Sequence, residues 1–304
     1  MSSRARGILL VILATGCWST AGIWTTQIIN GSGISAVALA FWRDLVTFLI
    51  LWAAIALFAP RYLRVRRRDL PYLAAMGAFG LGALHATWNL SVMLNGVSIA
   101  TVLQYNAPIF VTVLARVWWR ESITWQKAVA IGLALGGTLL IASPWALSGV
   151  RVTVAGVMVG LACALATSIY NLLGKRLSRD YSPWSIVLYV FGFGALGLLP
   201  LSLLGPVPRH LTPTVLPAFL GFILVPTVGG FGFYTRGLQD LQASVASILA
   251  TTEVPLAAFL SFVLLGERLG GWQIAGALMV VAGVLLVSAS GREPGRVRVG
   301  RAPS

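Results

Sequence analysis

The chain has 304 residues, of which 58% are hydrophobic and only 10% are charged. Soluble domains carry about 25% charged residues, so this composition excludes a water-soluble globular fold, which needs more charge to cover its surface. Two cysteines are too few for a disulfide framework. The chain is therefore predicted to be an all-α polytopic protein embedded in a lipid bilayer.

Ten apolar stretches of membrane-spanning length follow one another along the chain. A helix needs roughly 20 apolar residues to cross the hydrocarbon layer of a bilayer. The first stretch is longer than the ~7–15-residue core of a secretory signal peptide, so it is interpreted as the first spanning helix. The ten predicted spans are residues 7–29, 34–59, 70–94, 97–118, 124–142, 154–176, 183–205, 214–235, 241–265 and 270–289.

The net charge of +14 is distributed unevenly between the two ends of these spans. With the N-terminus inside, 18 of the 22 Lys and Arg residues fall in inner segments, three (Arg151, Arg209 and Arg268) in outer segments, and Arg43 within a span. Because basic residues concentrate on the cytoplasmic side, both termini are predicted to be cytoplasmic, in the cell's inner (plasma) membrane. The positive charge then faces anionic lipid, so no nucleic-acid partner is expected.

The second half of the chain repeats the first at an offset of about 146 residues. The run SIATVL from Ser98 matches SVASIL from Ser244, and Cys17 matches Cys163. Each half holds five spans, and an odd number forces the halves into opposite orientations, as in many secondary transporters. We therefore expect ten transmembrane helices as a 5+5 inverted repeat around a central cavity. Its parts are a first repeat at 1–145, an inverted second repeat at 146–290 and a disordered basic cytoplasmic tail at 291–304.

Three local motifs carry a resemblance to a known family. They are ATGCWSTAG in the first span, AFWRDL around Arg43 in the second, and NAPIFVTVLARVWWRE in the fourth, whose partner in the second half is TEVPLAAFLSFVLLGE. With these motifs nearly the whole chain resembles the drug/metabolite transporter superfamily, specifically the ten-helix EamA-type exporters. The triplet Trp18-Ser19-Thr20 makes it most similar to the YddG-type amino-acid exporters. The resemblance implies a central cavity and the export of small metabolites, aromatic amino acids among them.

Four ionisable side chains fall deep inside the predicted spans, away from the span ends: Arg43, Asp44, His85 and Glu253. Each costs about 2.5–3.5 kcal/mol in the membrane, so each is a functional candidate. Arg43 and Asp44 are candidates for intramembrane ion pairs or a substrate contact. Because adjacent helical residues point about 100° apart, these two are expected to have different partners. His85 either bonds a neighbouring helix or lines the cavity, and Glu253 is protonated, paired with Arg43 or facing a substrate ammonium.

The substrate site is predicted at the midplane, lined by spans 1, 3, 4, 6, 8 and 9. Its candidate residues combine mid-span depth with a polar or aromatic side chain. They are Trp18, His85, Tyr105, Asn106, Tyr170, Tyr234 and Glu253. Amides and aromatic walls of this kind suit a zwitterion with an apolar side chain.

Two mid-span prolines, Pro108 and Pro255, occupy matching positions in spans 4 and 9. A mid-helix proline removes a backbone hydrogen bond and leaves a kink, so both are predicted to be gating hinges. A second flexible point in each gate is predicted at glycine pairs in spans 3 and 8. These glycines are Gly80, Gly82, Gly229 and Gly230. The alternative is that both prolines are static kinks shaped by packing.

These patterns together predict a secondary transporter that exports small metabolites by alternating access, with neutral or aromatic amino acids favoured as substrates. An exporter of drugs or other small metabolites is the alternative. A membrane-embedded enzyme is remote, because HExxH, GxSxG, phosphate-loop and Cys/His metal spacings are all missing. No cofactor or metal is expected. The GxxxG motif from Gly132 to Gly136 packs span 5 on span 10 or, alternatively, mediates a homodimer.

Overall fold

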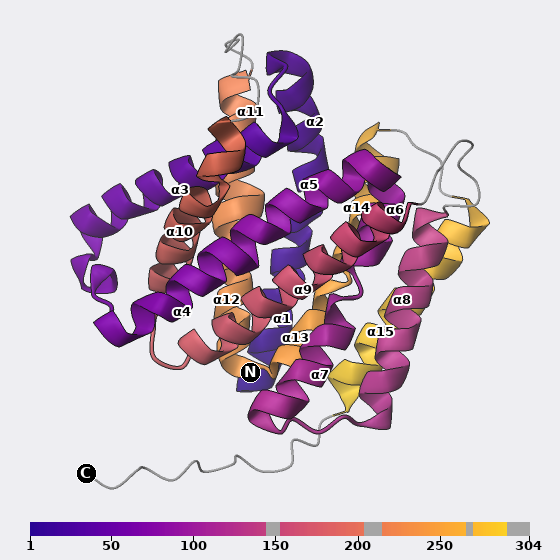
Figure 1. Ribbon diagram of the computed structural model, residues 1–304. Coiled ribbons are helices and arrows are strands. Elements are labelled where there is room, and N and C mark those ends of the chain that lie inside the picture. The colour runs from indigo at the N-terminus through magenta and orange to yellow at the C-terminus, as the bar shows by residue number, and fades with distance from the viewer. Residues whose placement is uncertain (144–152, 204–214, 266–269, 291–304) are drawn as a thin grey trace, which may run out of the picture.

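The computed structural model describes residues 1–143, 153–203, 215–265 and 270–290. Within these ranges every regular element is a helix, and the helices form one bundle (Figure 1). The predicted all-α class is confirmed. The division into inverted repeats at 1–145 and 146–290 stays a prediction, and the tail 291–304 lies outside the described residues, as do Arg151, Arg209 and Arg268.

Helical stretches occupy all ten predicted positions. The first five consist of α1 (Ser3–Trp18) with α2 (Ala21–Ser32), α3 (Ala36–Phe58), α4 (Leu70–Ala75) with η3 (Met76–Gly82) and α5 (Ala83–Asn95), α6 (Val97–Gln104) with α7 (Ala107–Trp119), and α8 (Trp125–Ala142). The last five consist of α9 (Val154–Leu177), α10 (Pro183–Leu203), α11 (Val215–Phe222) with η5 (Ile223–Gly230) and α12 (Phe231–Asp240), α13 (Ala243–Ala250) with α14 (Glu253–Leu265), and α15 (Gly271–Ala289). Two short 3₁₀ turns, η1 (Pro60–Leu63) and η2 (Arg67–Asp69), connect α3 to α4.

Nine of these stretches, among the described residues, are long and apolar enough to cross a membrane. The tenth, from α4 through η3 to α5, is continuous helix but is not among the nine. Polar side chains such as His85, Asn89 and Asn95 lower its hydropathy. They belong inside the bundle, since the Asn89 amide donates to the Ala36 carbonyl at 3.1 Å and polar groups in a span face protein or water.

Five of the ten stretches are interrupted near mid-length. The helices of spans 1, 4 and 9 break before α2, α7 and α14, while η3 and η5 are π-helical segments inside spans 3 and 8. Pro108 is the second residue of α7 and Pro255 the third of α14. The predicted mid-helix kinks are therefore helix starts, because the first turn of a helix accepts proline without losing a hydrogen bond.

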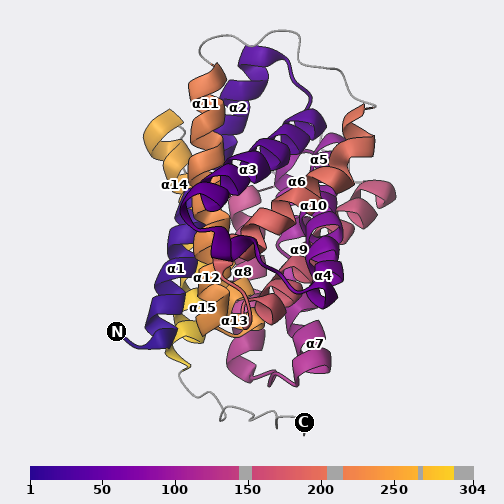
Figure 2. The ribbon, with the colours of Figure 1, turned by 90° about the vertical axis from the view of Figure 1, so that its left-hand side faces the viewer.

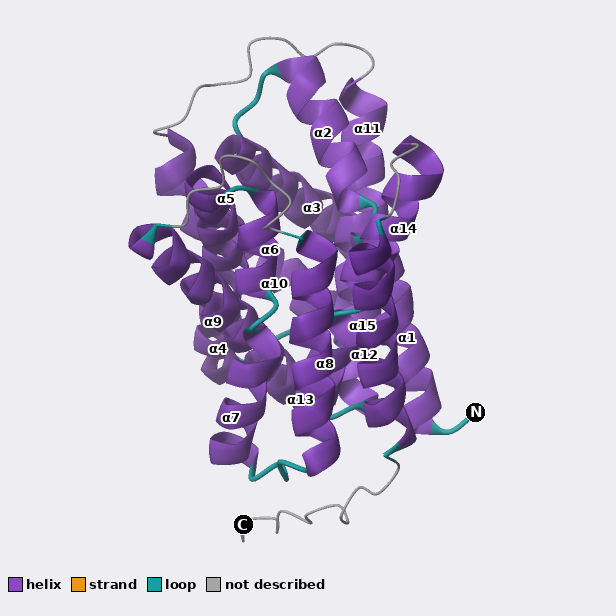
Figure 3. Ribbon diagram, turned by 90° about the vertical axis from the view of Figure 1, so that its right-hand side faces the viewer, coloured by secondary structure: helices purple, strands orange, loops and turns teal. Residues whose placement is uncertain are grey.

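The ends of the first and last helices lie together. The Arg4 guanidinium donates to the Val287 carbonyl at 2.9 Å, which places the start of α1 beside the end of α15. We call this the closed end of the bundle, and the opposite end, where α2 and α11 stand side by side, the open end (Figures 2 and 3). An even number of crossings puts both termini on one side of a membrane. That this side is cytoplasmic stays a prediction.

Small residues bring α8 and α15 into direct backbone contact. A Cβ atom on Gly137 would lie 2.5 Å from the Gly276 carbonyl oxygen, so no larger side chain fits there. Spans 5 and 10 do approach closely, but at Gly137 and Gly276 rather than through the predicted motif from Gly132 to Gly136. Gly132 lies in open space, and the homodimer alternative stays a prediction.

Candidate functional site

A cavity of about 940 Å³ occupies the middle and open end of the bundle. Its lining comes from the predicted spans 1, 3, 4, 6, 8 and 9. Span 2 also contributes, through Leu39 and Arg43, and the end of span 5 contributes Ile141. A volume of this size is at the upper end for a site that takes one small organic molecule.

Six of the seven predicted cavity residues line this space: Trp18, His85, Tyr105, Tyr170, Tyr234 and Glu253. The seventh, Asn106, does not. Its side-chain amide donates to the carbonyls of Val102 at 2.9 Å and Leu103 at 3.1 Å. The prediction was wrong because the break between α6 and α7 leaves the Val102 carbonyl without a backbone donor, and the Asn106 side-chain amide satisfies it.

Aromatic rings form the bottom of the cavity. The Trp18 ring centroid lies 5.1 Å from that of Tyr234 and 5.2 Å from that of Phe231, and Phe231 lies 5.5 Å from Tyr170. The contacts of Phe231 with Trp18 and Tyr170 are edge-to-face, and the Trp18–Tyr234 pair is tilted. Aromatic contacts at these distances stabilise a cluster beyond its apolar burial. Phe231 was not predicted, because a phenylalanine does not stand out in an apolar span. Its position one helical turn before Tyr234 is the signal that could have found it.

The two tyrosine hydroxyls of this aromatic floor form hydrogen bonds with residues on the neighbouring helices. The Tyr234 hydroxyl donates to the Asn171 side-chain oxygen, and the Tyr170 hydroxyl lies 3.3 Å from the Thr235 hydroxyl. Tyr234 and Tyr170 are only 1% and 3% exposed. The two tyrosine hydroxyls of the floor thus have hydrogen-bond partners, whereas the buried Trp18 Nε1 has none among the described residues. The packed rings separate the cavity from the closed end.

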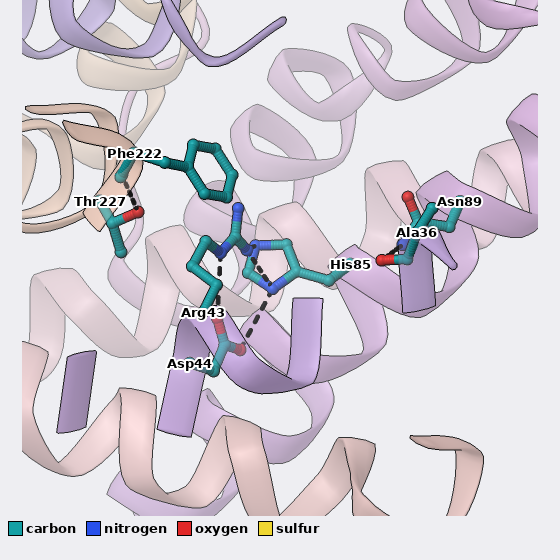
Figure 4. A network of polar contacts seen from close by, with 7 residues as sticks. All are labelled: Ala36, Arg43, Asp44, His85, Asn89, Phe222 and Thr227. Atoms are coloured by element: carbon teal, nitrogen blue, oxygen red, sulfur yellow. Dashed lines mark hydrogen bonds and ion pairs between the residues drawn. The ribbon is translucent and has the colours of Figure 1, made fainter. Parts of the chain in front are cut away.

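Arg43, Asp44 and His85 form one polar network on the wall of the cavity (Figure 4). Arg43 Nε lies 3.2 Å from Asp44 Oδ1, and His85 Nδ1 lies 3.2 Å from Asp44 Oδ2. The Arg43 guanidinium also contacts the His85 ring and lies 5.3 Å from the Phe222 ring centroid. Asp44 is completely buried, and its carboxylate is the counter-ion of Arg43.

The network corrects the expectation that Arg43 and Asp44 have different partners. The two share His85 and also pair with each other. Adjacent helical residues point about 100° apart at their Cβ atoms. The long arginine side chain nevertheless bends back far enough to reach the Asp44 carboxylate. The predicted intramembrane ion pair is thus formed between neighbours.

Glu253 lies across the cavity from this network, on α14. The Tyr105 hydroxyl donates to Glu253 Oε2 at 2.7 Å. The alternative pairing of Glu253 with Arg43 is not what the structure shows. The contact between Tyr105 and Glu253 joins the break in span 4 to the start of α14.

The predicted hinge glycines lie in or at the end of the π-helical segments, where they permit close contacts. Gly80 and Gly82 belong to η3, and Gly229 and Gly230 end η5. A Cβ atom on Gly80 would lie 3.1 Å from the Tyr170 backbone, and one on Gly230 would lie 2.4 Å from Trp18 Nε1. Two of the four glycines thus let aromatic residues of the floor sit against helix backbone. Their action as hinges stays a prediction.

Charged groups close the other end of the bundle. Arg6 binds both oxygens of Asp240 at 2.8 and 2.9 Å. The Glu121 carboxylate accepts the Ser244 hydroxyl at 2.5 Å and the Ala243 amide at 3.2 Å, both in the first turn of α13. A carboxylate at a helix N-terminus is stabilised by the helix dipole, so Glu121 fastens α13 to the loop between α7 and α8.

Within the described ranges, no group of three His, Cys, Asp or Glu side chains is placed to hold a metal ion. The site offers instead an aromatic floor, one neutralised cation and one carboxylate. Such a set can bind a small amphipathic molecule.

The model of the EamA-like transporter family matches residues 5–143 and again residues 154–289. The uncharacterized inner membrane transporter YicL of Salmonella typhimurium is 26% identical over 97% of this chain and 99% of its own. An uncharacterized transporter of Archaeoglobus fulgidus is 30% identical over 79% of this chain and 85% of its own.

A probable terminal-alkyne amino-acid exporter of Streptantibioticus cattleyicolor is 28% identical over 93% of this chain and 94% of its own. One crystal structure shares the fold with a TM-score of 0.77 and 18% identity, covering 93% of this chain and 96% of the other. Two matches to one family model span nearly all of the described residues. The chain belongs to the EamA-like transporter family and is a multi-pass membrane transporter of that family.

Proposed function

We propose that this transporter exports neutral amino acids, above all aromatic or apolar ones, from the cell through the central cavity. The observation that carries the proposal is the aromatic floor formed by Trp18, Tyr170, Phe231 and Tyr234 beneath a cavity of about 940 Å³. Aromatic and apolar walls with a few placed polar groups are the usual design of a site for a small organic molecule.

The charges of the cavity support a zwitterion or a neutral molecule over an anion. Arg43 is neutralised by Asp44, so the wall holds no free cluster of basic groups for a phosphorylated substrate. The probable terminal-alkyne amino-acid exporter of Streptantibioticus cattleyicolor, 28% identical, supports amino acids as the substrate class. A pump for cationic drugs is favoured less, because in the described part of the chain one carboxylate, that of Glu253, lines the cavity.

Alternating access supplies the transport step in this proposal. The cavity reaches the open end, whereas the aromatic floor and the charged contacts of Glu121 and Asp240 shut the closed end. Export then requires the closed end to open toward the cytoplasm while the open end shuts. The interruptions near Pro108 and Pro255 in two inverted repeats are the proposed hinges, with both termini on the cytoplasmic side of the plasma membrane.

Proteoliposomes containing the purified protein test this function directly. Counterflow of labelled phenylalanine, leucine and tryptophan should exceed that of protein-free vesicles, and Trp18→Ala should reduce it at least tenfold. Trp52→Ala is the matched control, because Trp52 is 52% exposed and does not line the cavity. Absence of counterflow across a full amino-acid panel, with drugs or other metabolites transported instead, would favour the alternative of a drug or metabolite exporter.

A further inference from the structure

One acidic side chain of the cavity lining has no basic partner. Arg43, His85 and Glu253 line the space, and Arg43 has Asp44 as its partner at 3.2 Å. Among the described residues Glu253 takes part in no ion pair, and its side-chain hydrogen bond is with the hydroxyl of Tyr105. The Glu253 carboxyl group is therefore left to meet a cation that enters the cavity.

The geometry at Glu253 keeps an oxygen available to a ligand. Oε2 accepts the Tyr105 hydroxyl at 2.7 Å. Oε1 has no partner in the described part of the chain and is not one of the buried unpartnered atoms. Since Glu253 lines the cavity, Oε1 is the oxygen that faces it.

Glu253 is the first residue of α14 and lies in its first turn. The amides that follow it do not compete for its carboxyl group, because the Val254 amide donates to the Thr251 carbonyl at 3.1 Å and Pro255 has no N–H. The hydrogen bond from the Tyr105 hydroxyl holds the carboxyl group in this position.

We propose that the cavity recognises its substrate by a primary ammonium group at Glu253, and that the substrate's carboxylate is dispensable. Amphipathic aromatic amines then bind as well as aromatic amino acids do. The ammonium pairs with the Glu253 carboxylate, while the aromatic floor contacts the ring. This inference rests on the proposed function and narrows the chemistry of the same site.

The opposite wall explains why the carboxylate contributes less. Arg43 Nε and Nη2 are used by Asp44 and His85, so one end of the guanidinium, Nη1, is left for a ligand (Figure 4). A substrate carboxylate at that nitrogen gains a hydrogen bond, but it also meets the field of Asp44. An ammonium at Glu253 meets no competing cation among the described contacts.

Three probes with the same phenyl ring separate the two charged groups. Phenylalanine has both, 2-phenylethylamine has only the ammonium, and 3-phenylpropionate has only the carboxylate. Binding to the purified full-length protein is measured by titration calorimetry, because the uncharged amine crosses membranes by itself. We expect phenylalanine and phenylethylamine to bind within about tenfold of each other and phenylpropionate at least tenfold more weakly than either.

Variants assign the effect to the carboxylate. Glu253→Gln should weaken both amine-containing probes at least tenfold and leave phenylpropionate unchanged or improved. Asp180→Asn is the matched control, because Asp180 is an exposed carboxylate that does not line the cavity and should change none of the three affinities. Tyr105→Phe removes the hydrogen bond to Glu253 Oε2. It should reduce the ratio of phenylethylamine to phenylpropionate affinity by a few fold. This variant provides a second test if the Glu253→Gln protein does not fold.

The outcomes distinguish this inference from the proposed function. Phenylpropionate binding as tightly as phenylethylamine, or a Glu253→Gln or Tyr105→Phe protein with unchanged preference, overturns the ammonium site. If labelled phenylalanine is carried in proteoliposomes but phenylethylamine neither binds nor competes, the inference alone fails. If no amino acid is carried at all, the proposed function fails first.

Discussion

The two ends of the bundle are built from the same long helical stretches but are held together differently. The closed end has an aromatic floor and charged contacts, such as Arg6 with Asp240 and Glu121 with the start of α13. At the open end, α2 and α11 pack on α3 through an apolar cluster around Ile28 and Phe222, and the cavity lies between them and the neighbouring helices.

This difference indicates which end of the bundle needs more energy to separate. Charged contacts and tightly packed rings hold the closed end, whereas at the open end an apolar cluster borders the cavity. Interruptions near mid-length divide spans 1, 3, 4, 8 and 9 into a closed-end half and an open-end half. We propose that these interruptions let one half of a helix move relative to the other.

The largest effect should come from the floor that separates the two ends. Tyr234→Ala removes a ring that is 1% exposed and leaves an unfilled cavity. For a large aromatic side chain this lowers the free energy of unfolding by about 3–5 kcal/mol. Tyr234→Phe keeps the ring and loses only the hydrogen bond to Asn171, about 1 kcal/mol. Thermal unfolding of both variants in detergent gives the ranking, and equal losses would contradict a floor held mainly by packing.

An intermediate effect is expected at the contact that fastens α13. Glu121→Gln removes a charged acceptor of two hydrogen bonds, worth about 1.5–3 kcal/mol, so the closed end should open at least ten times more often. A cysteine at Ser247, which is buried and lines the cavity, reports opening by its labelling rate from the side of the termini. Both native cysteines are replaced beforehand. An unchanged labelling rate would remove Glu121 from the closing contacts.

The smallest effect belongs to the open end. Gln27 is exposed and lines the cavity on α2, and surface substitutions of this kind change stability by less than about 0.5 kcal/mol. Gln27→Ala should therefore shift neither the unfolding temperature nor the Ser247 labelling rate. A shift as large as that of Glu121→Gln would mean that the two ends are held together equally.

The sequence predicted the helices well because burial in lipid leaves a direct trace in hydropathy. It also identified most of the cavity, because polar or aromatic residues at mid-span, such as His85 and Glu253, stand out against apolar neighbours. Phe231 and Phe222 were missed for the converse reason: an apolar aromatic side chain looks the same whether it faces lipid or substrate.

Local backbone geometry was the main source of error. The helix breaks fall two to four residues before Pro108 and Pro255, because proline fits best in a first turn. At the break beside Asn106, the side-chain amide of Asn106 donates to the Val102 carbonyl instead of facing the cavity. The pairing of Arg43 with Asp44 depends on side-chain conformation, which helical periodicity does not specify.

The central claim is that the two ends open in alternation around the cavity. Electron–electron double resonance between spin labels in lipid vesicles measures both ends at once. Labels at Asn30 and Leu94 span the open end, and labels at Ile123 and Gln239 span the closed end. Under conditions of transport with phenylalanine, the first distance should acquire a shorter population as the second acquires a longer one. Distances that change in the same direction, or a closed end that never lengthens while phenylalanine is carried, would contradict the account.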